Sequence, residues 1–560
     1  MTTAFDVLAE ALAVVGEPLA CGDGIGVSFA GTDPVFPTVF PLGEVGAAVL
    51  AACALEAARI WRDRSGQAQA ITVPVDAAAA AMRSARYLRP DPPPATPRRL
   101  GGLSAYRTAD GRYIYFQRLF PHHNERLSKV LGVPLEEPAM SSAVARWDGA
   151  VLEEAVNAGG ACAGLVRTRD EWLALPVAAY VAAAPLIDVT ALPGGPVKPV
   201  AAGPRPLSAL RVLDLTRVLA GPTSARALAE HGADVLRVSV PGLPDNDGMM
   251  KDTGHGKRSV ELDLKSRSGA ASLRSLMAGA DVFIQGYRPG ALAALGFGAD
   301  EVAALNPSIV TVDISAYGHL GPWRDRRGFD SVVQSVNGLA VTNAGAVDAV
   351  SGPPVFLPAN PLDYTTGYLA ALGALAALRR RAREGGGYQV RVSLARTGEW
   401  LWGLPRLAAA TAADGQKELP ADRLDELMIS RDTPFGRLRY LAPAAKLTAT
   451  PGNWDLPTPL PDQDAPTWLD QPGPGQAARL GCLPRLPGRR SDTAAGGPGT
   501  KPGMARCPKV ALRAELSGGA DVGRGAGARP VRAERRRRDP GLAAAHAPPC
   551  RAREAASRSR

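Results

Sequence analysis

The sequence lacks a paired-cysteine pattern, a long apolar run and a secretory signal. Its six cysteines are scattered through 560 residues, at positions 21, 53, 162, 482, 507 and 550, with no C-x-x-C pair. This spacing favours reduced thiols over a disulfide or zinc framework. No apolar run reaches about 18 residues, so no membrane span is predicted. The opening MTTAFDVLAEALAVVGEP is acidic before it is apolar, unlike a secretory signal, which predicts a cytoplasmic protein.

Two nucleotide-binding motifs are also missing. No G-x-G-x-x-G follows a predicted strand, and GDGIG at 22–26 has no strand before it. A nicotinamide cofactor is therefore not expected. No G-x-x-x-x-G-K-[ST] occurs, so ATP is not expected. No metal site is predicted.

Most of the chain carries no net positive charge. The formal net charge of +10 arises in residues 471–560, which hold 19 Lys and Arg against 6 Asp and Glu. The remaining 470 residues carry 45 basic and 48 acidic side chains, a net charge of −3. A neutral or acidic body with a basic tail is not the charge distribution of a nucleic-acid-binding domain. No nucleic-acid partner is therefore predicted.

The tail itself lacks Ile, Phe, Tyr, Trp and Asn, and 25 of its 90 residues are Gly or Pro. Such a segment cannot bury enough apolar surface to offset the entropy of ordering it. Residues 471–560 are therefore predicted to be disordered, and their deletion is expected to leave folding and activity intact. The abrupt change after Asp470 is also what a reading-frame slip would produce. A nucleic-acid-binding arm is the functional alternative.

Residues 205–395 alternate between predicted strands and helices. Apolar, β-branched runs predict strands at 210–216, 235–240, 259–264, 281–287, 308–317 and 388–395. Helices are predicted between them, one opened by Gly221-Pro222, one over SRSGAASLRSLMAGA and a long one from Asp363. Buried strands separated by helices are typical of an α/β fold with a mostly parallel sheet covered on both faces.

One segment of the sequence is an internal repeat. PLDYTTG at 361–367 matches PLGEVG at 41–46, and Gln389 matches Gln69 in the strand that follows each helix. The first copy has Gly43 where the second has Asp363. A predicted hairpin over 104–117, turning at Ala109-Asp110-Gly111, follows the first copy.

These features divide the chain at the Pro/Gly-rich linker 192–208. The predicted parts are a lobe over 1–200, which lacks the aspartate and contains a small domain at about 95–190, a second lobe over 201–470, which contains the parallel sheet and Asp363, and the tail.

Seven consecutive motifs in residues 205–400 resemble the family III CoA-transferases, also called the CaiB/BaiF family. They are VLDLTRVLAGP, GADVLRV, GKRSVELDLK, ADVFIQGYRPGAL, LNPSIVTVDISAYGHLGP, RRGFDSVVQSVNGL and PLDYTTGYLAALGALAAL. The resemblance implies a Rossmann-like parallel-sheet lobe with a smaller α+β domain. It also implies an enzyme that moves coenzyme A from an acyl-CoA thioester to a carboxylic acid.

The same resemblance assigns site residues. Asp363 falls on the family's nucleophilic aspartate, which carries CoA as a covalent aspartyl-CoA thioester. The positions that match CoA contacts are Val218, Leu219, Ala220, Lys257, Arg258, Gly286, Tyr287, Arg288 and Arg327. Gly101-Gly102 corresponds to a loop that covers the family's site. The chain departs from the family at Ser239 and Gly286, where glutamate and asparagine are usual.

The chemistry of these residue types agrees with the resemblance. Backbone N–H groups at a helix N-terminus suit the phosphates of CoA, and Lys257, Arg258 and Arg288 supply charge and forked donors. Surface Lys and Arg are more often simply solvated. An Asp at a helix start is most often a cap, although the helix N-terminus also favours the ionised carboxylate that a nucleophile requires.

Two alternative functions remain open. Acyl-CoA racemases of the same family carry a histidine before an aspartate, but here Phe329 precedes Asp330, so no imidazole is expected at that place. His255 and His319 lie at other positions, and His122-His123 is predicted to be a surface pair. The other alternative is a non-catalytic acyl-CoA-binding homologue. The sequence does not identify the acyl donor or acceptor.

Each of the two lobes has a part that the other lacks. The second has the sheet and Asp363 but no small domain after it, and the first has the small domain but no VLDLTRVLAGP segment. We therefore expect an internal pseudo-dimer with one active site per chain, present as a monomer or as a homodimer.

Overall fold

The computed structural model describes residues 3–19, 24–92, 105–243, 245–345 and 352–469. All of them belong to one compact unit. The predicted disordered tail and the Gly101-Gly102 loop lie outside the described residues.

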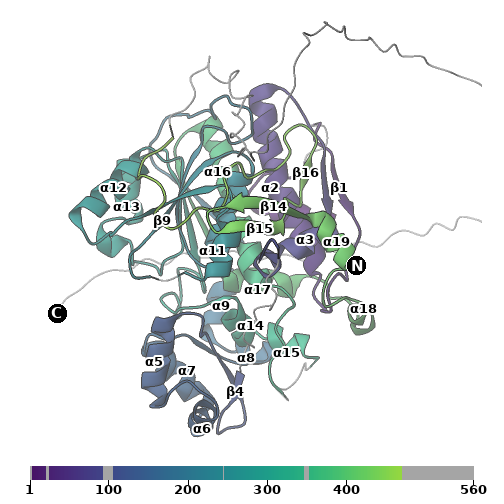
Figure 1. The fold of residues 1–560 in the computed structure, drawn as a ribbon, viewed down its shortest axis with the longest axis vertical. Helices are drawn as coiled ribbons and strands as arrows, with labels where there is room; N and C mark the ends of the chain where they lie inside the picture. Colours follow the sequence, from purple (N-terminus) through teal and green to yellow (C-terminus); the bar gives the residue numbers. More distant parts are fainter. Residues whose placement is uncertain (1–2, 20–23, 93–104, 244, 346–351, 470–560) are drawn as a thin grey trace, which may run out of the picture. The chain divides into compact units, whose positions relative to one another are not determined.

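A seven-stranded sheet organises the fold (Figure 1). Six strands are parallel: β8 (Arg211–Leu215), β9 (Asp234–Ser239), β10 (Lys257–Glu261), β11 (Val282–Gln285), β12 (Val310–Ser315) and β13 (Gly387–Ser393). Their spatial order is β10-β9-β8-β11-β12-β13. Renumbered from β8, this is the order 3-2-1-4-5-6 of a Rossmann-type sheet. The predicted α/β fold with a parallel sheet is confirmed.

Helices cover both faces of this sheet. Successive side chains of a strand point to opposite faces, so Leu213 and Leu236 pack in the cluster with α12 (Arg267–Ala278). Val212 and Val235 pack in the cluster with α16 (Pro361–Glu384). The other covering helices are α13 (Ala299–Leu305), beside α12, and α10 (Ala220–Glu230), beside α16. Figure 1 shows α12 and α13 on the side of the sheet away from α16.

Most predicted elements of residues 205–395 are present within two residues of the expected bounds. The strand predicted at 259–264 instead runs from Lys257 to Glu261 and pairs with β9. Leu262 and Leu264 had suggested that this strand ends later. Both side chains are buried, but they belong to the segment that follows the strand. A seventh strand that was not predicted, β7 (Asp188–Leu192), pairs antiparallel with β13 at the edge of the sheet.

The repeated segment forms the same elements twice. α2 (Leu42–Ser65), β2 (Ile71–Pro74) and α3 (Val75–Ala81) correspond to α16, β13 and α17 (Leu394–Gly403). Both long helices span 24 residues and pack against each other. The thiol of Cys53 on α2 donates to the carbonyl oxygen of Tyr368 on α16, at 3.2 Å.

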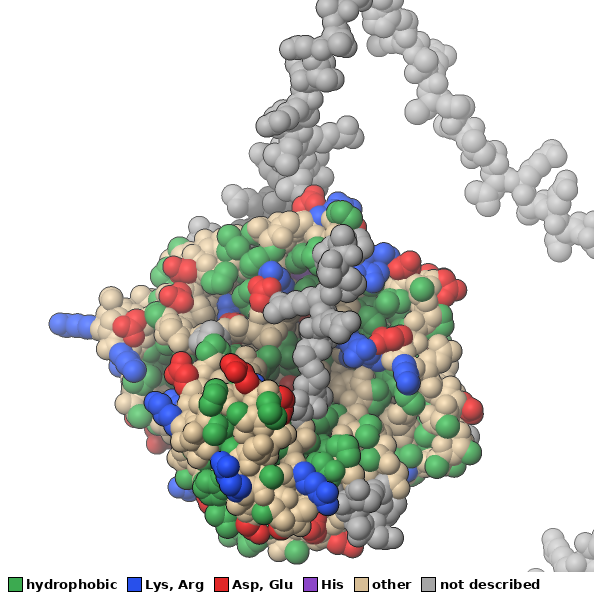
Figure 2. Space-filling model, turned by 60° about the horizontal axis from the view of Figure 1, so that its bottom comes forward, with side chains coloured by type: hydrophobic (Ala, Val, Ile, Leu, Met, Phe, Trp, Pro, Cys, Tyr) green, Lys and Arg blue, Asp and Glu red, His purple; other side chains and the backbone are tan. Residues whose placement is uncertain are grey.

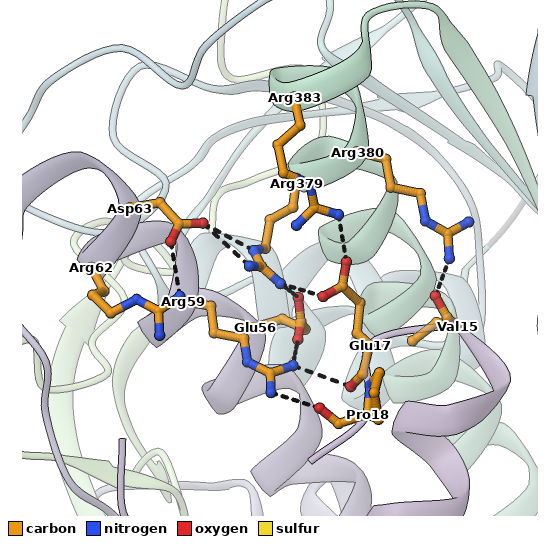
Figure 3. A network of polar contacts seen from close by, with 10 residues as sticks. All are labelled: Val15, Glu17, Pro18, Glu56, Arg59, Arg62, Asp63, Arg379, Arg380 and Arg383. Carbon is orange, nitrogen blue, oxygen red and sulfur yellow. Dashed lines mark hydrogen bonds and ion pairs between the residues drawn. The ribbon is translucent and has the colours of Figure 1, made fainter. Parts of the chain in front are cut away.

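A network of ion pairs also joins the two copies, near the carboxyl ends of α2 and α16 (Figure 3). Arg379 of α16 contacts Glu56 of α2 at 3.0 Å, Glu17 at 2.6 Å and Asp63 at 3.3 Å. Arg59 of α2 contacts the other oxygen of Glu56 at 2.6 Å. Glu56 is fully buried, and losing one partner from a buried ionic network leaves an uncompensated charge.

A small α+β domain lies within residues 105–165. Its three-stranded antiparallel sheet comprises β4 (Ala105–Arg107), β5 (Tyr113–Phe116) and β6 (Ala163–Leu165). Its helices are α5 (Pro121–Leu131), α6 (Ala139–Val144) and α7 (Gly149–Ala158), which enclose a separate apolar core. The predicted hairpin is confirmed, and Gly111 takes the positive φ of 79° that its turn requires.

Shorter elements complete the described part of the chain. They are α1 (Ala4–Val14), β1 (Val27–Ala30), α4 (Ser84–Tyr87), β3 (Arg89–Pro90), α8 (Arg169–Leu173), α9 (Pro176–Ala183), α11 (Asp247–Thr253), the 3-10 helix η1 (Ala293–Leu295), α14 (Asp330–Val336), α15 (Leu339–Asn343), α18 (Ala409–Ala413), α19 (Ala421–Leu427), β14 (Met428–Thr433), β15 (Gly436–Leu441) and β16 (Lys446–Leu447). No helix among the described residues combines the length and apolar character needed to cross a membrane. On the face shown in Figure 2, basic and acidic side chains are interspersed.

Candidate active site

The main cavity lies at the carboxyl edge of the parallel sheet. Its volume is about 380 Å³, and its lining includes Leu215 at the end of β8, most of the turn that follows it, residues after β11, and Ile314–Ala316 at the end of β12. β8 and β11 are the neighbours at which the strand order reverses. In open α/β sheets this switch point is where ligands bind.

Asp363 lies on the lining of this cavity. It is the third residue of α16, which begins with Pro361, a residue suited to a first helical turn. The side chain is only 6 % exposed, and within the described residues its carboxylate makes no hydrogen bond.

Asp330 performs the capping role that Asp363 does not. One oxygen of its carboxylate accepts from the backbone N–H groups of Leu362, at 2.8 Å, and Asp363, at 3.1 Å. Gln334 donates to the other oxygen. Because the helix is capped from another segment, the carboxylate of Asp363 is left for the cavity.

The two carboxyl groups titrate as a pair. Burial raises the pKa of Asp330 to about 6, although hydrogen bonds from Asp363, Gln334 and Leu362 act to lower it. Burial, and then the charge of Asp330, raise the pKa of Asp363 well above the ordinary value of an aspartate. Burial and the charge of Asp330 thus both oppose ionisation of Asp363.

The turn after β8 has a strained backbone. Val218 has a φ of +72°, a conformation that a β-branched residue rarely adopts and that costs of order 1–3 kcal/mol. Val218 and Ala220 line the cavity, whereas the Leu219 side chain is fully buried in the core. No side chain caps the start of α10 at Leu219, so its first N–H groups remain available for an anion.

The segment after β11 supplies a second wall. Gly286, Tyr287 and Arg288 line the cavity, together with Arg327, and the CoA contacts predicted for them remain predictions. Within the described residues, the guanidinium groups of Arg288 and Arg327 have no ion pair or hydrogen bond. Burial, and then the charges of Arg288 and Arg126, lower the pKa of Arg327. A second cavity of about 230 Å³ shares Tyr287 and Arg288 with the first.

Lys257 and Arg258 are not on the lining of either cavity. The fully buried Lys257 Nζ lies 2.8 Å from Asp214 Oδ2 and 2.8 Å from the carbonyl oxygen of Pro222. Arg258 forms a two-pronged contact with Asp234. Lys257 thus supports the start of α10 from within the protein, and the CoA contacts predicted for both residues remain predictions.

The sequence-based interpretation of His122-His123 was wrong. Both residues line the Asp363 cavity, and His123 is only 4 % exposed. They lie at the start of α5 in the small domain, with Phe120 just before them and Arg126 one turn later, and these two also line the cavity. The sequence feature that could have indicated this position is the histidine pair at a helix start, about 240 residues from Asp363.

The other residues weighed for catalysis lie as follows. Phe329 lines the Asp363 cavity, and His319 lines the second one. His255 is fully buried and stacks on Tyr440, with ring centroids 3.6 Å apart. Across the described ranges, no group of three or more His, Cys, Asp or Glu side chains is arranged to hold a metal ion.

Comparison with known proteins supports one family. A sequence model of CoA-transferase family III matches residues 3–193 and 207–463, more than half of the chain. Among curated proteins, an acetyl-coenzyme A transferase of Hypoxylon pulicicidum is 38% identical over 201 residues, covering 35% of this chain and 34% of that protein. A succinyl-CoA–D-citramalate CoA-transferase of Chloroflexus aurantiacus is 35% identical, covering 34% of this chain and 50% of that protein.

The chain thus spans a third to a half of the length of these relatives. Among solved structures, Rv3272 of Mycobacterium tuberculosis is 31% identical, with 36% of this chain and 56% of that chain covered and a TM-score of 0.33. A CAIB/BAIF family protein of Brucella suis is 23% identical, with 42% and 65% covered and a TM-score of 0.31. The extent of the family match, on both sides of the linker, decides the assignment: the chain belongs to CoA-transferase family III.

Proposed function

We propose that this protein transfers coenzyme A from an acyl-CoA thioester to a carboxylic acid, with Asp363 as the nucleophile. The observation that carries the proposal is the carboxylate of Asp363, which faces the switch-point cavity without a hydrogen-bond partner in the described residues. A structural cap would be bonded to backbone N–H groups, and Asp330 occupies that role. The printed names of the relatives, an acetyl-coenzyme A transferase and a succinyl-CoA–D-citramalate CoA-transferase, support the reaction class.

The reaction proceeds through alternating anhydrides and thioesters. An oxygen of Asp363 attacks the thioester carbonyl, and the C–S bond breaks. This step releases CoA thiolate and forms an acyl-aspartyl anhydride. The thiolate attacks the aspartyl carbonyl, which releases the first acid and forms aspartyl-CoA. The acceptor carboxylate attacks aspartyl-CoA and expels the thiolate again. The thiolate then attacks the acceptor's carbonyl, which gives the new acyl-CoA and regenerates Asp363.

The cavity suits the anions that this sequence requires. Arg288 and Arg327 are unpaired within the described residues and provide forked donors for CoA phosphates. The uncapped start of α10, beside Val218 and Ala220, provides backbone N–H groups. A cationic lining also favours retention of the thiolate between steps.

Mass spectrometry of the protein mixed with acetyl-, succinyl- and formyl-CoA tests the nucleophile. At least one donor is expected to add CoA covalently to Asp363, and hydroxylamine is expected to convert that adduct to a hydroxamate at the same residue. Asp363→Asn should lower turnover by at least about 1000-fold, because among the described residues that line the cavity no other carries a carboxylate.

Glu384→Gln is the matched control, since Glu384 is an exposed carboxylate at the other end of α16. It should behave as the parent protein. Unchanged activity in Asp363→Asn, or labelling at a different residue, overturns the assignment.

An acyl-CoA isomerase is the second candidate, because the structure places an imidazole, His123, in the cavity with Asp363. Burial, and then nearby cations, lower the pKa of His123 to about 4, which makes it a weak base at neutral pH. Incorporation of deuterium at the α-carbon of an acyl-CoA in D₂O, without any acceptor acid, is the result that would favour isomerisation.

We further propose that residues 1–200 are a degenerate copy that completes the single site of the chain. Asp33 accepts from the backbone N–H of Glu44 on α2 at 2.9 Å, as Asp330 does on α16. A Cβ atom at Gly43 would lie 2.6 Å from Asp33 Oδ1 and 2.8 Å from Val75 Cγ1. The first copy therefore has no space for the counterpart of Asp363.

A further inference from the structure

His123 is a buried imidazole whose polar atoms are incompletely used. It lies in the first turn of α5, is 4 % exposed and lines the Asp363 cavity. Its Nδ1 atom is buried and has no hydrogen-bond partner among the described residues. A buried polar atom without a partner costs about 1–3 kcal/mol, and within the described residues the other ring nitrogen, Nε2, forms no hydrogen bond either.

Three rings fix the orientation of this imidazole. Phe120 and Phe329 contact it edge to face, with centroids 5.8 and 5.7 Å away, and His122 lies 4.3 Å away. Phe329 directly precedes Asp330, whose carboxylate holds the backbone of Asp363. His123, Phe329 and Asp363 all line this one cavity.

The surroundings of His123 select for an anion. The charged and titratable groups that act on it are His122, Arg327, Arg126 and Arg217, all of which are bases. Burial and these groups keep its pKa near 4, so at neutral pH the ring is uncharged and offers one N–H donor. The start of α5 has no side-chain cap, and its positive dipole end adds to the same preference.

Two kinds of anion enter a CoA-transferase site, the phosphates of CoA and the carboxylate of the free acid. Arg288 follows β11 and lines both cavities, which suits it to a phosphate of CoA. His123 instead lies between two phenylalanine rings in the cavity of Asp363, where the acid must approach the aspartyl carbonyl. A neutral donor is suited to hold a carboxylate that must still react.

We propose that the imidazole of His123 hydrogen-bonds the carboxylate of the free acid beside Asp363 and so determines acid binding. This rests on the CoA-transferase function proposed above. The bond orients the acid while one carboxylate oxygen attacks aspartyl-CoA and the C–S bond to CoA breaks. No proton is transferred from His123. The small domain of the first copy thereby contributes a substrate-binding residue to the site of the second.

An isotope-exchange experiment tests this proposal. Its probes are an acyl-CoA that loads Asp363, from the acetyl, succinyl and formyl panel, and the ¹³C-labelled form of its own free acid. His123→Phe keeps an aromatic ring between Phe120 and Phe329 but removes the donor. It should raise the KM of the acid about 10- to 100-fold, the usual effect of losing a hydrogen bond to a charged group. The KM of the acyl-CoA should stay within about twofold.

Two further variants sharpen the result. His123→Asn keeps a polar group near the position of Nδ1 and should restore the KM of the acid to within about threefold of the parent. Lys129→Ala, an exposed change in the last turn of α5, should alter neither constant. An unchanged KM of the acid in His123→Phe, or equal changes for both substrates, overturns the proposal.

A second measurement does not depend on the folding of any variant. In the parent protein with CoA bound, titration with the acid should shift the imidazole ¹⁵N resonances of His123, and absence of a shift overturns the proposal. If no acyl-CoA loads Asp363 in the parent protein, the proposed function itself fails, and the acid-binding role fails with it. Loading without an effect at His123 rejects the acid-binding role alone.

Discussion

Asp330 and Asp363 show how one buried carboxylate leaves another available for chemistry. An aspartate at a helix start normally satisfies its own helix, and its hydrogen bonds then lower its pKa and its reactivity. Here Asp330 accepts from the first N–H groups of α16. The charge that makes Asp330 a good cap also opposes ionisation of Asp363. In the proposed mechanism, Asp330 therefore both positions the nucleophile and, after burial, raises the pH at which the nucleophile ionises.

The first prediction follows from this pair. Asp330→Asn retains an oxygen that can cap α16 but removes the charge that opposes ionisation of Asp363. The pKa of Asp363 then falls, so the ionised nucleophile persists to lower pH. We expect the rising limb of kcat/KM against pH to move by about one unit toward acid.

Asp300→Asn, an exposed change on α13, should leave the profile in place. A profile of Asp330→Asn that stays fixed or moves to higher pH contradicts the coupling.

Individual site residues were predictable where a backbone turn carries them. Val218, Arg288 and Arg327 follow recognisable motifs, and the structure brings them to the cavity of Asp363. Lys257 shows the limit of such reasoning, because sequence does not reveal that Asp214 lies within 2.8 Å of its amine. His123 could not be placed, since its position depends on the docking of a domain far away in the sequence.

At the scale of elements, the site depends on close packing between α10 and α16. A Cβ atom at Gly367 would lie 2.4 Å from the carbonyl oxygen of Ala220 and 2.9 Å from Thr223 Cβ. Gly367 therefore allows α16 to approach the first turn of α10. That turn presents the N–H groups and the strained Val218 to the cavity. We therefore expect helix packing and CoA binding to be coupled at Gly367.

Gly367→Ala should consequently affect both stability and binding. The added methyl group forces α10 away from α16, which we expect to lower the free energy of unfolding by about 1–3 kcal/mol. The KM for acyl-CoA should rise at the same time, because the first turn of α10 moves with the helix. Denaturant unfolding and steady-state kinetics measure the two effects.

Gly403→Ala provides the matched control. It also lies in a helix, at the end of α17, but nothing lies within 4 Å of an added Cβ atom. Its unfolding free energy should stay within about 0.5 kcal/mol of the parent. A Gly367→Ala protein as stable and active as the parent contradicts the packing argument.

Helices and strands could be predicted where the residue pattern that marks them lies within the element itself. Strands β8, β9, β11, β12 and β13 are buried on both faces and appear as apolar runs whatever lies beside them. The antiparallel edge strand β7 was missed because its partner β13 lies about 200 residues later. The fold class thus followed from local pattern, whereas the last strand of the sheet required knowledge of the tertiary contact.

At the scale of the whole molecule, the two copies share one interior. The buried faces of α2 and α16 belong to a single hydrophobic cluster. The ion pairs of Arg379 with Glu17 and Glu56 add polar contacts between the same copies (Figure 3). Either copy alone would expose this apolar surface and leave buried charges without partners. The chain is therefore expected to behave as a dimer whose subunits happen to be linked.

Cleavage of the linker tests that expectation. Ala201 and Ala202 are exposed, so a protease site inserted between them should be cut without disturbing either copy. The two pieces should co-elute in gel filtration and separate only in denaturant, because buried packing rather than the linker holds them together. The cleaved protein should retain most of its exchange activity. The C-terminal piece expressed alone should have none, since it lacks the α2 contacts and His123. Separation of the cut pieces in buffer, or full turnover by the C-terminal piece, would refute a site built from both copies.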